Sequence, residues 1–122
     1  MLNIERIEEL RSDIRKTGSD QEEANQYFTK ILREEEKIYE EILDRIRGLG
    51  ISFEVSNGDP KWTALVEERH SLLMIAERRC TEFMYEVNEC RKKMNTTCES
   101  TVEELEQEIK RLETLGGDLS GL

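Results

Sequence analysis

Two long stretches of the chain, 4–47 and 60–115, each carry one stripe of apolar residues at steps of three and four. Such steps return to one face of an α-helix, so each stretch is predicted to form an amphipathic helix. The single proline and a glycine-rich segment between the stretches mark one turn. The sequence therefore predicts an all-α fold. It is a long, coiled-coil-like antiparallel hairpin of two helices, completed as a bundle by a partner or a second copy.

The turn sets the boundaries of the predicted hairpin. The single domain is expected to comprise a helix over 4–47, a turn over 48–59, a helix over 60–115 and a frayed tail over 116–122. Gly48 is predicted to end the first helix in the left-handed conformation, and 51–55 to form a short extended segment whose apolar side chains plug the end of the hairpin. Asp59 and Pro60 provide an N-cap and a first helical residue for the second helix.

Each helix contains one point at which the sequence leaves two interpretations open. The apolar stripe runs straight through Gly18, which favours one continuous helix, whereas Ser19 and Glu22 form a capping box that would start a new one. In the second helix, the weak helix formers at 95–97 would allow a kink or a restart.

The two predicted helices differ in length, at about 65 Å and about 85 Å for a rise of about 1.5 Å per residue. The second is therefore expected to overhang the first over approximately 104–115, where its apolar stripe would have no partner inside the chain. An uncovered apolar stripe is typical of a protein interface. Together with the outer flank of the first helix, this predicts a set of partner-binding residues. They are Leu32, Tyr39, Ile46, Trp62, Val102, Leu105, Ile109 and Leu112.

Two charged residues occupy stripe positions at which an apolar residue is expected, Glu35 in the first helix and Arg69 in the second. If Arg47 faces Pro60 across the turn, Glu35 lies near Arg69. A half-buried ion pair between them would fix the register of the hairpin. The alternative is that both charges reach solvent at the rim of the interface.

Candidates for catalysis or metal binding are few. Glu67 and His70 have the Glu-x-x-His spacing of two-metal helical bundles, but the chain has one histidine and Glu67 points away from the stripe. The cysteines are too far apart along one helix to form a disulfide or share a zinc ion; they are Cys80, Cys90 and Cys98. We therefore expect a non-enzymatic chain without cofactor or metal.

The formal net charge of −10 argues against binding to nucleic acid or to an anionic membrane surface, because both require clustered Lys and Arg. No apolar run approaches the length that spans a bilayer, and the acidic N-terminus lacks the features of a signal peptide. The sequence predicts a cytoplasmic protein, with export together with its partner as the alternative.

An acidic chain of this length, with two long helices and a tryptophan at the start of the second, resembles the WxG-type helical hairpins of type VII secretion. The motif corresponds to Trp62-Thr63-Ala64, with alanine in place of glycine. The Tyr-x-x-x-Asp/Glu export signal of that family is matched by Tyr85 and Glu89, but these lie within a predicted packing surface, so we do not assign them that role.

In length and layout the chain is similar to the small, charge-rich helical hairpins encoded beside LXG toxins in Gram-positive bacteria. This resemblance implies an adaptor or targeting chaperone that binds the helical N-terminal domain of the toxin. The partner would then be that domain or a similar hairpin, with a homodimer as a further form. The alternative is a coiled-coil oligomerisation or scaffold module of a larger assembly.

Overall fold

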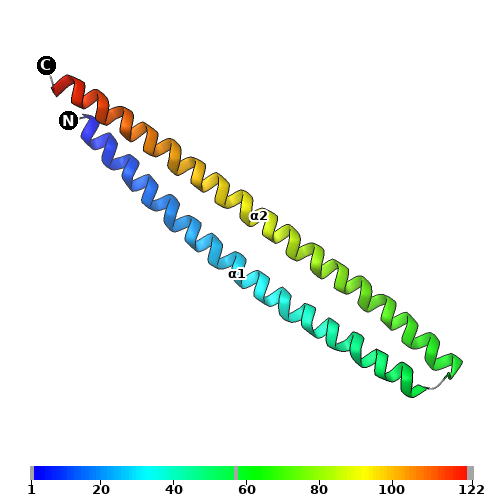
Figure 1. Cartoon of the computed structure of the whole chain (residues 1–122). Coiled ribbons are helices and arrows are strands. Elements are labelled where there is room, and N and C mark those ends of the chain that lie inside the picture. The colour runs from blue at the N-terminus through cyan, green and yellow to red at the C-terminus, as the bar shows by residue number, and fades with distance from the viewer. Residues whose placement is uncertain (1, 57, 121–122) are drawn as a thin grey trace. The chain divides into compact units, whose positions relative to one another are not determined.

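The protein consists of two long helices joined by a short turn (Figure 1). The structure, a computed structural model, describes residues 2–56 and 58–120, with side chains from 3 to 55 and from 58 to 116. Helix α1 spans Leu2–Ser56 and helix α2 spans Pro60–Ser120, and the described residues contain no strand. The predicted all-α helical hairpin is confirmed.

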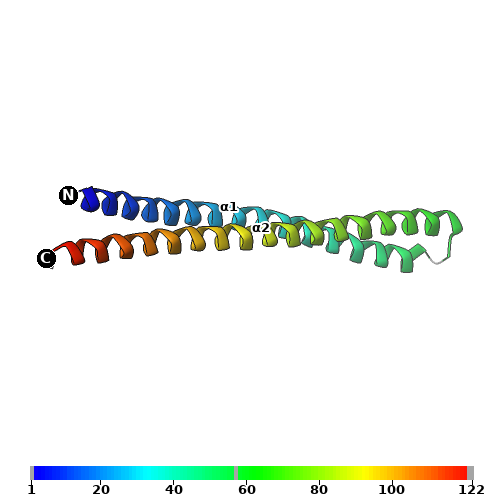
Figure 2. The same cartoon turned by 90° about the horizontal axis from the view of Figure 1, so that it is seen from above.

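Contacts divide the hairpin into two units, each a pair of antiparallel helix segments. Unit 1 combines Met1–Tyr27 with Cys90–Leu122, and unit 2 is Phe28–Glu89, which contains the turn. Within unit 1, both views show the beginning of α1, in blue, beside the end of α2, in orange and red (Figure 2). Each unit is described below by itself.

Both helices are continuous where the sequence left a break open. Helix α1 runs through Gly18, as the uninterrupted stripe favours, and α2 runs through 95–97 without a restart. Threonine hydroxyls near these points donate to the backbone carbonyl one turn earlier, from Thr17 to Asp13 and from Thr101 to Thr97, both at 2.9 Å. Such bonds satisfy the hydroxyls without competing for the helix's own amides.

The turn lies later in the sequence than predicted. Helix α1 continues through Gly48 and Gly50 to Ser56, so the helix stop expected at Gly48 and the extended segment over 51–55 are both wrong. Among the described residues the glycine with positive φ is Gly58, at 89°. Each helical glycine costs about 1 kcal/mol relative to alanine, which the further turns of backbone hydrogen bonding in α1 offset.

The start of α2 agrees with the prediction. The backbone amide of Lys61 donates to Asp59 Oδ1 at 3.1 Å, and the amide of Thr63 donates to the Asp59 carbonyl at 2.8 Å. Asp59 is therefore the N-cap and Pro60 the first helical residue, a position where the missing N–H of proline has no cost. At the other end α2 is helical as far as Ser120, so most of the predicted frayed tail is helix, and 121–122 lie outside the described residues.

The later turn changes which residues face each other in unit 1. Arg11 Nη2 lies 3.3 Å from Glu113 Oε1, so α1 reaches the part of α2 that was predicted to overhang. Ile109 is buried, and the other members of that stripe are half-buried, namely Val102, Leu105 and Leu112. The prediction of an uncovered stripe over 104–115 is wrong, because it assumed a turn about two helical turns too early.

The core of each unit is thin, as two helices alone can enclose few side chains. In unit 1 the buried apolar residues are Leu10 and Ile109, and in unit 2 they are Val66 and Cys80. Most other stripe residues are half-buried.

Candidate docking surface

The described part of the chain exposes many of its large apolar side chains close to the turn. Eight of the fourteen that are exposed lie in the segment 51–75 of unit 2. We call these eight the turn-end surface; they are Ile51, Phe53, Val55, Trp62, Leu65, Leu72, Met74 and Ile75. Of these, Leu65 and Leu72 are seven positions apart and so lie on one side of α2, and neighbouring exposed apolar side chains are typical of a protein interface.

The wider stretch 45–75, which adds the preceding residues of α1, is electrically balanced within an acidic chain. Residues 45–75 contain four basic and four acidic side chains, so the net charge of −10 is carried entirely by the rest of the chain. An acidic surface opposes close approach of another acidic chain, whereas a neutral apolar surface does not. The stretch 45–75 is thus the part of unit 2 whose net charge least opposes close contact with another acidic protein.

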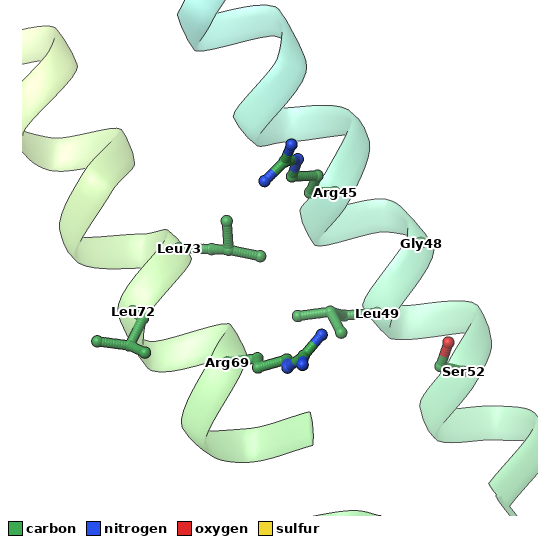
Figure 3. Close-up of a pocket in the computed structure, with 7 residues that line it drawn as sticks. All are labelled: Arg45, Gly48, Leu49, Ser52, Arg69, Leu72 and Leu73. Atoms are coloured by element: carbon green, nitrogen blue, oxygen red, sulfur yellow. The ribbon is translucent and has the colours of Figure 1, made fainter. Parts of the chain in front are cut away.

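Within this region, a hollow of about 610 Å³ lies between α1 and α2, and we call it the arginine groove (Figure 3). It is lined by Arg45, Gly48, Leu49, Ser52, Arg69, Leu72 and Leu73. Leu49 from α1 and Leu73 from α2 point toward the opposite helix and form its apolar part (Figure 3). Gly48 lines the hollow without a side chain, and a Cβ atom added there would meet nothing within 4 Å.

Arg45 and Arg69 extend into the arginine groove from opposite helices (Figure 3). Both are exposed, and neither forms an ion pair or hydrogen bond with any residue that the structure describes. Arg47 pairs with Asp44 at 3.2 Å and Arg111 with Glu108 at 2.6 Å, whereas the exposed arginines at 15, 33, 78 and 79 resemble the groove pair in that their guanidinium groups have no partner among the described residues. The groove therefore combines apolar walls with two guanidinium groups that have hydrogen-bond donors to spare.

Two further hollows adjoin the turn in unit 2. One, of about 390 Å³, contains Trp62, whose indole Nε1 donates to the Ser52 carbonyl at 3.4 Å. The other, of about 450 Å³, is lined in part by Glu67 and His70, the pair with metal-binding spacing. Among the residues that the structure describes, no three His, Cys, Asp or Glu side chains are grouped to hold a metal ion. The apolar side chains at 53 and 55 are exposed rather than plugging the hairpin.

The predicted ion pair between Glu35 and Arg69 is not formed. Glu35 instead faces Cys80, about three helical turns beyond Arg69, and the thiol donates to Glu35 Oε1 at 3.1 Å. Burial, the hydrogen bond and the nearby carboxylate raise the pKa of Cys80 from 9.0 to about 11, so the thiol stays protonated at neutral pH. The predicted ion pair and the predicted overhang are wrong for the same reason, because both were derived from a turn placed too early in the sequence.

Unit 1 contains a polar layer that the sequence did not predict. Asn95 Oδ1 accepts from Gln21 Nε2 and from Asn25 Nδ2, both at 2.9 Å. Asn25 Oδ1 accepts from Arg91 Nε at 2.9 Å and from Asn95 Nδ2 at 3.3 Å. We call these four residues the amide layer. The available signal was Gln21 at a stripe position of the first helix, opposite amide residues in the second.

The structure places the predicted partner-binding residues in different settings. Trp62 belongs to the turn-end surface, and Arg69, predicted as half of a register pair, lines the arginine groove. The flank residues of α1 are half-buried, namely Leu32, Tyr39 and Ile46. The arginine groove itself was missed, because Gly48 was interpreted as a helix stop.

A comparison with known protein families, curated proteins and solved structures gives no match. No helix among the described residues contains an apolar stretch long enough to cross a membrane.

Proposed function

We propose that the chain is a non-enzymatic helical adaptor that binds a helical segment of a partner protein through the turn-end surface. The observation that carries this proposal is the concentration of exposed apolar side chains at 51–75, within a stretch, 45–75, whose acidic and basic residues balance. A partner helix that packs on such a surface would bury apolar area, and each Å² buried would favour binding by about 25 cal/mol. Amphipathic helices bind apolar grooves in this way, by residues at steps of three and four.

In its specific form the proposal is that the partner is the helical N-terminal domain of an LXG toxin, which the adaptor holds for type VII export. The support is the resemblance in length, charge and layout to the hairpins encoded beside such toxins. A two-helix chain that docks on a helical domain is consistent with this role, and the cytoplasm is where the two would meet before export.

A second candidate function is self-association of two copies into a four-helix bundle, as a scaffold module. The same exposed apolar residues favour it, because a bundle would cover Leu65 and Leu72, which are 53% and 60% exposed. The two candidates differ in what covers the turn-end surface, so the oligomeric state of the purified chain separates them.

The test is light scattering coupled to size-exclusion chromatography on the chain alone and mixed with the helical N-terminal domain of an LXG toxin. Wild type is expected to be a monomer alone and to form a stable complex with the domain. The double variant Leu65→Glu/Leu72→Glu should lose the complex and keep its circular dichroism spectrum.

The matched control is Leu115→Glu in unit 1, which makes the same substitution at a leucine that is 49% exposed. It should bind like wild type. A complex that survives Leu65→Glu/Leu72→Glu would exclude the turn-end surface as the docking site. A wild-type dimer that this variant dissociates would favour the scaffold module.

A further inference from the structure

We propose that the arginine groove receives the carboxylate of an Asp or Glu that lies within the apolar stripe of the partner's helix. This inference rests on the proposed function and adds to it a chemical requirement on the partner. Its occupant is an amphipathic protein helix with one acidic residue at a position that would otherwise be apolar.

The groove has the composition of a carboxylate receptor. Arg45 and Arg69 extend into it from opposite helices, and both lack a partner among the described residues (Figure 3). A guanidinium presents its N–H groups in a planar fork that matches the two oxygens of a carboxylate. Figure 3 shows the two guanidinium groups at different levels of the groove, with Leu49 and Leu73 between them, so a carboxylate that enters beside these leucines can accept from either arginine.

The charge of the groove, compared with that of the whole chain, also favours an acidic occupant. The chain has 28 acidic residues for 18 basic ones, yet neither groove arginine is paired within the described residues. Arg47, two residues beyond Arg45, does pair with Asp44 on its own helix. The groove is thus a basic site in an acidic molecule, and charge complementarity selects an acidic group for it.

The surroundings favour an acidic side chain on a helix over a small free anion. Leu49 and Leu73 line the groove, and Leu72 joins it to the turn-end surface. An acidic residue inside an apolar stripe would place its carboxylate in the groove while its apolar neighbours cover this surface. Covering the groove excludes water, which strengthens the charge-assisted hydrogen bonds.

The test uses a display library of amphipathic helical peptides, each with an apolar stripe and all twenty residues at its central stripe position. The full chain serves as bait in three forms: wild type, Arg45→Gln/Arg69→Gln, and the control Arg15→Gln/Arg79→Gln. The control removes the same two charges from exposed arginines outside the groove. Circular dichroism of all three verifies that the helices are intact.

Wild type and the control are expected to enrich peptides with Asp or Glu at the central position. A selected Glu peptide should bind them about tenfold more tightly than its Gln version, the effect of one charge-assisted hydrogen bond. Arg45→Gln/Arg69→Gln should still bind the peptides but without preference for the acidic residue.

Peptides that bind wild type without an acidic preference would overturn the carboxylate inference and leave the docking function intact. An acidic preference that persists in Arg45→Gln/Arg69→Gln would do the same. If no peptide binds and the toxin domain forms no complex, the proposed function itself is wrong. If wild type is a dimer that Arg45→Gln/Arg69→Gln dissociates, a second copy occupies the groove, which overturns the proposal of a partner's helix.

Discussion

The amide layer of unit 1 allows the coupling between two side chains to be predicted from their shared hydrogen bonds. Asn25 and Asn95 each take part in three of the bonds of this layer, and two of these bonds join the two residues to each other. At about 1 kcal/mol net per bond, Asn25→Ala and Asn95→Ala should each lower the free energy of unfolding by about 3 kcal/mol. The double variant loses four distinct bonds, or about 4 kcal/mol, so the coupling energy is about 2 kcal/mol.

The measurement is equilibrium unfolding in urea, followed by circular dichroism for wild type, both single variants and the double variant. The matched control is Gln26→Ala with Gln107→Ala, two exposed amides of the same unit, which should change the free energy of unfolding by less than about 0.5 kcal/mol each. Effects of Asn25→Ala and Asn95→Ala that add within about 0.5 kcal/mol would refute the shared-bond reasoning. Single effects as small as those of the controls would show that the layer contributes nothing to stability.

Three further predictions concern packing, glycine and a thiol. Leu10→Ala should lower the free energy of unfolding in urea by about 3 kcal/mol, because Leu10 is 1% exposed, whereas Ile4→Ala, at a position 65% exposed, should change it by less than about 0.5 kcal/mol. Gly18→Ala and Gly48→Ala should each raise the free energy of unfolding by about 0.5–1 kcal/mol, since a Cβ atom meets nothing at either position. Gly48→Ala alone should also weaken partner binding in a titration, because only Gly48 lines the groove. The raised pKa of Cys80 stabilises the fold below pH 9.0, and this contribution should be lost as the pH rises toward about 11; a Cys80→Ala variant should show a smaller loss over that interval.

The helices were predictable because their signal is periodic and long. Apolar residues at steps of three and four extend over many turns, so a single exception such as Gly18 does not remove the pattern. The start of α2 was predictable for a different reason. Asp59 and Pro60 are residues whose chemistry fits one position each, and the structure places both there.

The turn was misplaced because two local signals competed. Gly48 and Gly50 have the composition of a helix stop, and so does the segment that follows Ser56. A helical glycine costs about 1 kcal/mol, which is too little to end a helix whose following residues can form backbone hydrogen bonds. That error shifted every predicted pair of facing residues, so Glu35 was assigned to Arg69, whereas in the structure Glu35 accepts a hydrogen bond from Cys80.

The arginine groove could not be predicted from the sequence because of the same error in the turn. The groove depends on which residues of α1 lie opposite Arg69, and the position of the turn decides this. With the turn after Ser56, α1 is helical at Gly48 and Leu49, and these line the same hollow as Arg69. A chain shaped for hairpin stability alone would gain from alanine at 48, where a Cβ has open space, and from a glutamate one helical turn from Arg69, the spacing at which Glu41 precedes Arg45. Unit 2 has neither, and the same segment leaves apolar residues exposed. An acidic, amphipathic helix in the groove would cover these apolar residues and pair with Arg69, which is why we infer that unit 2 is shaped for a complex.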